Sequence, residues 1–172
     1  MPDSPAEQTA QAAPSPPSTL ILGLGNVLLT DEAVGAAVLK ALEPLARARP
    51  EVTLMDGGTL SFTLAGPIGD AAQLVVVDAA KMGQAPGTVR VLEDEAMDAQ
   101  LSKHANSVHE VSLADLFDIA KLTDSLPARR ALIGIEPERV DWGSQLTRAV
   151  AAAVPRAVAE IEALIARWED GG

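Results

Sequence analysis

The sequence contains no cysteine and no tyrosine, and its only aromatic residues are two phenylalanines and two tryptophans among 172 residues. The absence of cysteine excludes disulfide bonds, thiolate metal sites and a cysteine nucleophile. Hydrophobic residues nevertheless make up 48% of the chain, so the core must be built from aliphatic side chains. Such a core suits helices packed on a parallel sheet better than an aromatic-rich β-sandwich.

Basic residues are also scarce, and the 13 lysines and arginines leave a formal net charge of −11 at pH 7. A surface this acidic repels phosphate backbones and anionic lipids, so we expect neither nucleic acid nor a membrane as a partner. No apolar run reaches the length of about 20 residues that spans a bilayer. Residues 1–18 have neither basic residues nor an apolar segment, so they do not form a secretory signal and we expect a cytoplasmic protein.

Residues 1–18 are rich in proline, alanine and serine and show no apolar periodicity, which predicts a disordered N-terminal tail. Residues 19–170 alternate between short apolar runs and stretches of helical periodicity, which predicts a single α/β domain. The predicted strands cover residues 19–24, 52–55, 74–77, 87–92 and 131–135. The predicted helices cover residues 33–45, 60–65, 112–122 and 146–168.

Several residues at the ends of these elements carry their own predictions. Thr30 is expected to cap the helix that follows it, and Ser112 with Asp115 predicts a capping box. The Gly-Pro pair at 66–67 is expected to end the short helix before it. Pro155 is expected to kink the last helix or split it in two. Residues 93–108 are polar and are predicted to be irregular.

Strands that alternate with helices and are joined by short connections predict a mostly parallel sheet with helices on both faces. In such sheets, ligands bind outside the carboxyl ends of the strands. Acidic residues follow four of the predicted strands at these ends. They are Glu32, Asp56, Asp78 and Glu136.

One interpretation of this edge is a dinucleotide site. Gly23 and Gly25 stand between a strand and a helix, and Asp56 ends the second strand, where a ribose-binding acid is expected. Leu28, however, occupies the place of the third glycine. Asp31 and Glu32 also lie where the helix N-terminus would receive a pyrophosphate, and two carboxylates there repel that ligand. We therefore disfavour a nucleotide binder.

A second interpretation is a metal site that also works in acid–base chemistry. Glu32 and Asp78 are expected to meet at the same edge of the sheet, and the chain offers His104 and His109 as further ligands. A set of Glu, Asp and His suits a divalent metal such as nickel or zinc. Simpler explanations exist for each residue, because a carboxylate in a first helical turn stabilises the helix dipole. Asp78 can equally cap a turn, and single histidines are more often surface or core residues.

Five segments, in this order along the chain, resemble the hydrogenase maturation proteases, which process the large subunit of nickel–iron hydrogenases. They are Gly23–Gly35, Asp56–Thr59, Val75–Ala79, Val111–Asp115 with a histidine ahead of it, and Ile133–Pro137. The resemblance implies a three-layer α/β/α sandwich with a twisted, mostly parallel (mixed) five-stranded sheet. It covers about residues 19–165, whereas the family usually begins close to its first strand.

The resemblance also implies an activity and a site. Family members are endopeptidases that remove a short C-terminal extension from the large-subunit precursor after nickel has been inserted. The metal-binding residues of the family map onto Glu32, Asp78 and His109, and Glu32 and Asp78 also become the expected catalytic residues. His104 is an alternative ligand, and we prefer His109 because it directly precedes the start of the 112–122 helix.

The resemblance further implies a cofactor and a partner. The partner is the hydrogenase large-subunit precursor, and the protein itself is expected to be a monomer. Nickel is expected to arrive with the precursor as a recognition element, and other divalent cations are expected to substitute for it in the free protein. A non-catalytic relative that senses the metallated large subunit as an assembly chaperone is the alternative.

Overall fold

The computed structural model describes residues 17–103 and 111–171, so all but the last two residues of the predicted 1–18 tail lie outside the described chain. The described end of this segment joins the sheet. The Ser18 carbonyl oxygen accepts a hydrogen bond of 2.9 Å from the amide of Gln73, at the start of the third strand.

All five predicted strands are present, and they form one sheet in the order β2-β1-β3-β5-β4. They are β1 (Thr19–Leu24), β2 (Val52–Gly58), β3 (Gln73–Ala79), β4 (Val89–Glu93) and β5 (Arg129–Ile135). The strands β2, β1, β3 and β5 are parallel to one another, and β4 pairs with β5 in the antiparallel direction. The structure therefore confirms the predicted mixed, mostly parallel sheet.

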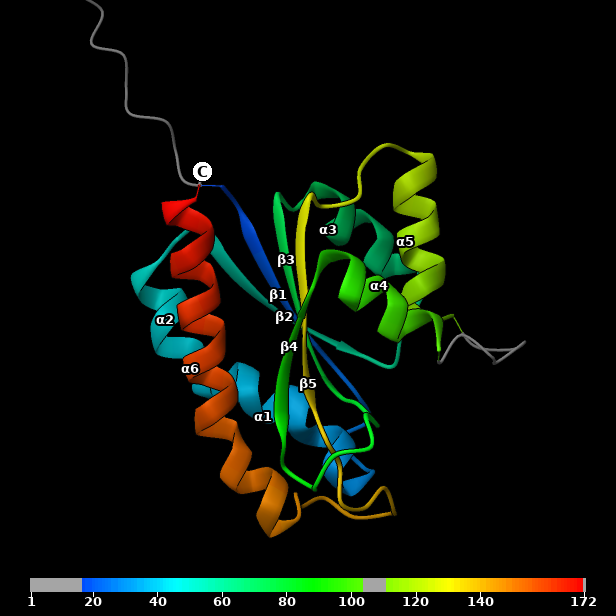
Figure 1. The fold of residues 1–172 in the computed structure, drawn as a ribbon, viewed down its shortest axis with the longest axis vertical. Helices are drawn as coiled ribbons and strands as arrows, with labels where there is room; N and C mark the ends of the chain where they lie inside the picture. The colour runs from blue at the N-terminus through cyan, green and yellow to red at the C-terminus, as the bar shows by residue number, and fades with distance from the viewer. Residues whose placement is uncertain (1–16, 104–110, 172) are drawn as a thin grey trace, which may run out of the picture.

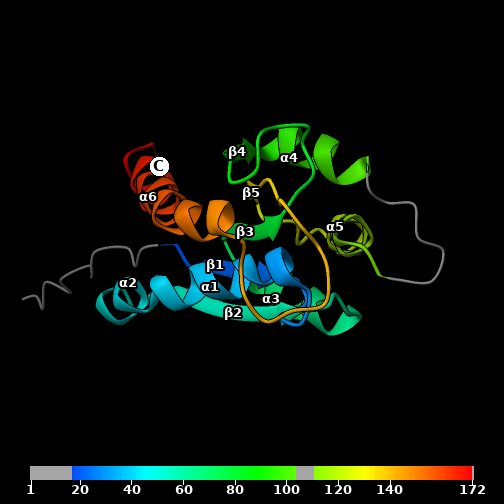
Figure 2. The same cartoon turned by 90° about the horizontal axis from the view of Figure 1, so that it is seen from below.

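Helices cover both faces of this sheet and give the predicted three layers (Figures 1 and 2). On one face lie α1 (Val34–Ala41), α2 (Glu43–Ala48) and α6 (Arg148–Asp170). On the other face lie α3 (Ala65–Asp70), α4 (Asp94–Ser102) and α5 (Leu113–Leu122). Two short 3₁₀ helices, η1 (Thr30–Ala33) and η2 (Phe62–Leu64), lead into α1 and α3.

The central strands β1 and β3, and residues 131–135 of β5, are mostly apolar because both of their faces are buried. Side chains alternate between the two faces along a strand. Ile21, Val77 and Ile133 belong to the core under α1 and α6, whereas Leu22 and Val76 belong to the core under α3 and α5. Continuous aliphatic runs are thus the expected sequence of central parallel strands, and the prediction of these strands depended on them.

The prediction that residues 93–108 are irregular is wrong in its first part, because α4 occupies Asp94–Ser102. Only Met97 and Gln100 of this helix are buried, so it carries almost no apolar stripe for a periodicity argument to detect. The position of α4 is fixed by a residue that lies outside residues 93–108. Asp98 forms a salt bridge of 2.6 Å with Arg130 on β5.

The prediction for Gly66 and Pro67 is wrong, the split at Pro155 is also wrong, and the capping box is confirmed. The pair Gly66 and Pro67 does not end a helix but lies in the first turn of α3, where a missing amide hydrogen breaks no helical bond. Pro155 does not split the last helix, because α6 runs continuously through it. The side chains and amides of Ser112 and Asp115 bond reciprocally at the start of α5.

Candidate functional site

Two glycines let the start of the helical segment pack directly against the end of β1. A Cβ atom on Gly25, whose φ is +119°, would lie 1.9 Å from the carbonyl oxygen of Glu32. A Cβ atom on Gly35 would lie 2.4 Å from the carbonyl oxygen of Leu24. Only glycine permits such close approaches of backbone to backbone. The chain therefore folds back tightly and leaves Glu32 at the carboxyl end of the sheet.

Asn26 orders this turn and orients Glu32. Its side-chain oxygen accepts a hydrogen bond of 2.9 Å from the amide of Leu28, a local turn typical of asparagine. Its backbone amide donates a hydrogen bond of 3.3 Å to Oε2 of Glu32. The second carboxylate oxygen of Glu32 is thus left to face the cavity described below.

Asp31, next to Glu32 in the sequence, is fully buried and has a different role. Its carboxylate accepts hydrogen bonds of 2.8–2.9 Å from the amides of Glu138, Arg139 and Thr147 and from the Thr147 hydroxyl. Burial alone raises the pKa of Asp31, but these hydrogen bonds outweigh it and hold the pKa below its usual value. Asp31 therefore anchors the loop between β5 and α6.

Thr30 helps to anchor the same loop, and the prediction that it caps a helix is wrong. Its hydroxyl donates to the Arg139 carbonyl oxygen at 2.7 Å and accepts from the Asp141 amide at 3.0 Å. Its φ of 37° is in the left-handed region, and it is the first residue of η1, whose N-cap is Leu29. The N-cap of α1 is Ala33, without a side-chain cap.

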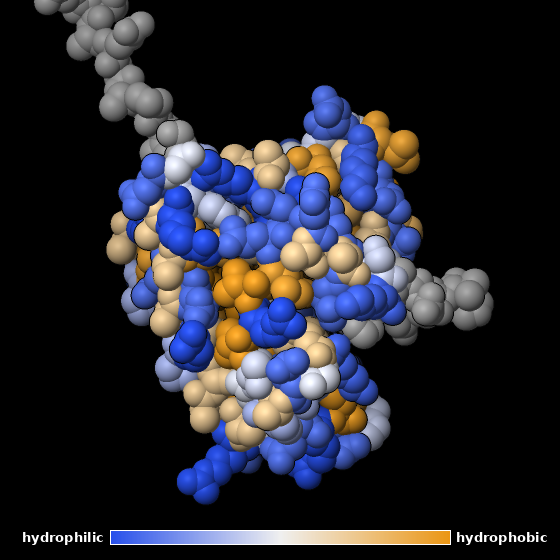
Figure 3. Space-filling view, in the orientation of Figure 1, coloured by the Kyte–Doolittle hydropathy of each residue, from blue (hydrophilic) through white to orange (hydrophobic). Residues whose placement is uncertain are grey.

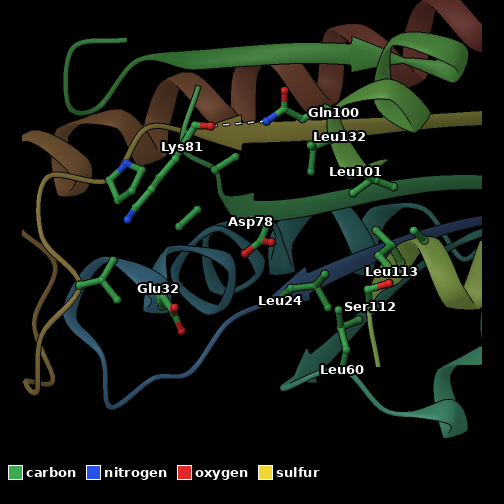
Figure 4. A pocket seen from close by; sticks show the side chains of 15 residues that line it. Leu24, Glu32, Leu60, Asp78, Lys81, Gln100, Leu101, Ser112, Leu113 and Leu132 are labelled. Carbon is green, nitrogen blue, oxygen red and sulfur yellow. Dashed lines mark hydrogen bonds between the residues drawn. The ribbon is translucent and has the colours of Figure 1, made fainter. Parts of the chain in front are cut away.

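The structure brings Glu32 and Asp78 together at one cavity. Asp78 is the next-to-last residue of β3, which is the neighbour of β1 in the sheet. Both side chains line a cavity of about 310 Å³, and Figure 4 shows their carboxylates directed into it. Both also line an adjoining open groove of about 840 Å³ that extends towards Phe62.

The electrostatics of the pair distinguish Asp78 from the other acidic residues. Burial raises its pKa first, and the negative charge of Glu32 raises it further, while a hydrogen bond from the Ala79 amide acts in the opposite direction. The result is a pKa of about 7 for Asp78. A buried carboxylate whose charge is disfavoured in this way is expected to be stabilised by a cation beside it.

The cavity has a polar side and an apolar side (Figure 4). The carboxylates and Lys81 lie on the polar side, and aliphatic side chains from β1, β5, α4 and the start of α5 line most of the rest, with Gln100 and Ser112 among them. These aliphatic residues include Leu24, Leu101, Leu113 and Leu132. Such a mixture suits a peptide segment, whose backbone is polar and whose side chains include apolar ones.

Glu136 was a candidate from the sequence, but the structure gives it a supporting position. It is buried directly after β5, and its Oε2 atom accepts a hydrogen bond of 2.6 Å from the amide of Met82. Its own backbone bonds to Gly87 and Thr88, in the turn before β4. Glu136 therefore ties the segment after β3 to the end of β5 and is fully engaged by the chain.

The histidine candidates, His104 and His109, lie outside the described residues. Within residues 17–103 and 111–171, no cluster of three or more acidic or histidine side chains could hold a metal ion. Val111, the first described residue after these histidines, lines the groove together with Glu32 and Asp78. The assignment of His109, or of His104, as a third ligand therefore stays a prediction.

Asp56, the expected ribose-binding acid of the disfavoured nucleotide site, has a local role in the structure. Its carboxylate accepts a hydrogen bond of 2.9 Å from the amide of Gly58, two residues further on. The helical segment that would receive a pyrophosphate carries Asp31 and Glu32 in its first turn.

In the part of the chain that the structure describes, no helix is long and apolar enough to cross a membrane.

Comparisons with known proteins point in one direction. A sequence model for the family described as hydrogenase maturation protease matches residues 36–164. The chain is 35% identical to the hydrogenase 2 maturation protease of Escherichia coli over 147 residues, which cover 85% of this chain and 89% of that protein. It is 36% identical over 148 residues to the hydrogenase expression/formation protein HoxM of Cupriavidus necator, covering 86% of this chain and 73% of that protein.

Solved structures give the same result. The hydrogenase maturating endopeptidase HybD from Escherichia coli superposes with a TM-score of 0.78 and 32% sequence identity, covering 87% of this chain and 93% of that chain. The NiFe hydrogenase maturation protease HybD from Thermococcus kodakarensis gives a TM-score of 0.66 and 27% identity, covering 86% and 99%. Sequence and fold therefore lead to the same group of proteins.

Proposed function

The chain belongs to the hydrogenase maturation protease family, and on this premise we propose that it is an endopeptidase acting on the large-subunit precursor of a nickel–iron hydrogenase. The reaction removes a C-terminal extension from that precursor. One observation identifies the residues on which the proposed activity depends. Glu32 and Asp78 follow neighbouring parallel strands and share one cavity at the edge of the sheet where ligands bind.

We infer that this cavity binds the nickel ion carried by the precursor. The donor set fits a divalent cation, because burial and the nearby charge of Glu32 raise the pKa of Asp78, and a bound cation would offset both effects. Glu32 and Asp78 supply oxygen ligands, and His109, with His104 as the alternative, supplies an imidazole nitrogen. Other divalent cations are expected to occupy the same ligands in the free protein.

The chemistry follows from these residues. A bound divalent ion polarises a carbonyl group or lowers the pKa of a water molecule. The residues of the chain position the peptide: carboxylates at one side of the cavity face the scissile bond, and the aliphatic wall receives neighbouring side chains. A carboxylate of this pair is placed to accept the proton released when water attacks the carbonyl carbon.

The test compares nickel-loaded and nickel-free precursor as substrates for the purified protein, with the product identified by mass spectrometry. Cleavage of the loaded precursor alone is the expected result. Equal cleavage of both would contradict nickel recognition but leave the endopeptidase intact. Cleavage of neither, with stable binding of the loaded form, would instead identify an assembly chaperone that senses the metal centre.

The same proposal includes the setting of the reaction. We propose that the protein acts as a monomer in the cytoplasm, with the precursor as its partner and neither a membrane nor nucleic acid involved. The formal charge of −11 supports the absence of nucleic acid and membrane partners, because a net negative charge favours cationic ligands and disfavours phosphates. Sedimentation of the purified protein tests the oligomeric state directly.

A further inference from the structure

Large apolar side chains gather on the exposed surface around the cavity. Six large hydrophobic residues of the described chain are exposed, and five of them follow the carboxyl ends of β1, β2 and β5. These five, which we call the apolar rim, are Val27, Leu28, Phe62, Val140 and Trp142. The sixth, Leu122, ends α5 and lies at the opposite end of that helix from the cavity. Single exposed apolar residues are ordinary, but a group at one edge marks an interaction surface.

The apolar rim borders the cavity directly. Val140 lines the cavity together with Glu32 and Asp78. Phe62, whose side chain is 61% exposed, lines the adjoining groove with the same two carboxylates. In Figure 3, apolar atoms are visible among hydrophilic ones at the lower right, where the loops after β1, β3 and β5 lie in Figure 1. A molecule that enters the cavity or the groove therefore lies next to Val140 or Phe62 of the rim.

Two distant loops are joined to build the rim. The amide of Gly143 donates a hydrogen bond of 2.9 Å to the carbonyl oxygen of Leu28, and the amide of Thr30 donates one of 2.9 Å to the carbonyl oxygen of Gly143. Trp142 is therefore held beside the loop that follows β1, although it is 81% exposed. A surface fixed in this way loses little conformational entropy on binding.

Charge indicates what kind of surface the rim accepts. Among the described residues, Glu138 and Asp141 are exposed in the loop that carries Trp142, together with the basic Arg139, and Lys81 is exposed at the cavity. Arg139 is already close to Asp141, at 3.7 Å. Together with the carboxylates of the cavity, this edge is acidic, so a complementary partner is apolar with basic residues around it.

We propose that the apolar rim is the docking surface for the folded body of the hydrogenase large-subunit precursor, with Trp142 as its anchor. This inference depends on the proposed function for the identity of the partner. The cavity of about 310 Å³ holds only a short peptide segment, so the body of a protein substrate must lie outside it, against the rim. Exposed tryptophan is the residue type that most often dominates such contacts.

The experiment measures steady-state cleavage of nickel-loaded precursor by the wild type, Trp142→Ala and Leu122→Ala. Trp142→Ala is expected to raise KM at least about tenfold and to leave kcat within about twofold, because docking precedes the chemical step. Leu122→Ala removes an equally exposed apolar side chain outside the rim and is the matched control. It is expected to leave both constants unchanged. Should Trp142→Ala fail to fold, Phe62→Ala tests the other side of the rim.

Three results would overturn the docking surface. The first is an equal KM for the rim variant and Leu122→Ala, and the second is a loss confined to kcat. The third is a wild-type dimer that Trp142→Ala converts into a monomer with unchanged affinity for the precursor, which would assign the rim to a second copy of this chain. If the wild type cleaves nothing, the Kd for immobilised precursor replaces KM, so failure of the proposed function remains distinguishable from failure of docking.

The charge of the partner is tested separately with Glu138→Lys. Its side chain is exposed beside the rim, and reversing its charge is expected to raise KM several-fold at low salt. The difference is expected to shrink at high salt, where the interaction is screened. A KM that Glu138→Lys leaves unchanged or lowers would contradict a partner surface with basic residues.

Discussion

Asp31 and Asp78 are acidic residues at the same edge of the sheet, but the chain treats them in opposite ways. Burial raises the pKa of Asp31, yet hydrogen bonds from the loop after β5 more than compensate, so its pKa lies below the usual value. Among the described residues, Asp78 receives a hydrogen bond only from the Ala79 amide, and burial with the nearby charge of Glu32 raises its pKa to about 7.

The difference separates an acid that holds the fold from an acid that remains available. A carboxylate whose oxygens are occupied by donors of its own chain stabilises the loop that supplies them. A carboxylate with a single such donor, beside a second carboxylate at a cavity, is instead ready for a cation or a proton. The same difference separates the adjacent residues Asp31 and Glu32. Asp31 holds the loop after β5, and only Glu32 lines the cavity.

The contrast between the two kinds of acid would fail if Glu32 and Asp78 proved dispensable for cleavage of the precursor. Asp78→Asn and Glu32→Gln keep the size of each side chain but remove its negative charge. Each is expected to lower kcat/KM for nickel-loaded precursor by about a hundredfold or more, because a proposed metal ligand and proton acceptor is lost. The matched control is Asp118→Asn, an exposed acid on α5, which is expected to change nothing. Full processing by either variant would reject the site.

Asp31→Ala is expected to have the next largest effect, on stability rather than on chemistry. It leaves the amides of Glu138, Arg139 and Thr147 without their acceptor, so we expect the free energy of unfolding to fall by about 2–4 kcal/mol. Urea unfolding measures this decrease in the free energy of unfolding. Asp141→Ala, an exposed acid in the same loop, is the control, with an expected change below about 0.5 kcal/mol. Similar values for both variants would remove the structural role of Asp31.

The pH dependence of stability is expected to separate the two acids by sign. The pKa of Asp78 in the metal-free folded protein is about 7, against 3.8 for the ordinary group. Between these values the folded state holds a proton that the unfolded state has lost, so this residue makes stability fall as pH rises towards 7. Asp78→Asn is therefore expected to be about 2–4 kcal/mol more stable than the wild type at pH 8 and nearly equal at pH 4.

Asp31 is expected to give the opposite slope. Because its folded pKa is lowered, its contribution is complete above the ordinary value of 3.8 and disappears as pH falls through the folded pKa. Urea unfolding from pH 3 to pH 8, with a chelator present, measures both slopes with the variants Asp78→Asn and Asp31→Asn. An Asp78→Asn advantage that does not grow with pH would contradict the proposed difference between the two sites.

The sequence was sufficient for the features that depend on neighbouring residues. Continuous aliphatic runs located the central strands, and Ser112 with Asp115 located the start of α5, because strand burial and capping are local patterns. The meeting of Glu32 and Asp78 was also predictable. Both follow parallel strands, and the carboxyl ends of parallel strands lie at one edge.

Features that depend on distant residues could not be predicted in the same way. Asp31 was interpreted as a carboxylate favouring a helix dipole, but its partners lie 107 to 116 residues further along the chain. Nothing in the local pattern around Asp31 distinguishes it from Glu32. The helix α4 was missed for a similar reason, because the Arg130 that pairs with it belongs to another element.

The smallest expected effect tests how finely the Asp31 network is balanced. Thr147→Val keeps the shape of the side chain but removes the hydroxyl that donates to Asp31 at 2.9 Å, while the backbone amide of residue 147 still donates at 2.8 Å. Thr147 is the N-cap of α6 and makes no side-chain cap bond, so no capping energy is lost with the hydroxyl. We therefore expect the free energy of unfolding to fall by about 1–2 kcal/mol, less than for Asp31→Ala.

Thr147→Ser keeps the hydroxyl and is the control for this substitution. Because one of the hydrogen bonds that lower the pKa of Asp31 disappears in Thr147→Val, acid unfolding is also expected to begin at a higher pH in this variant than in the serine variant. Equal acid-unfolding midpoints for the two variants would mean that the backbone amides alone hold the Asp31 carboxylate in its charged form. The contrast with Asp78 would then depend on main-chain geometry and not on the side chain at position 147.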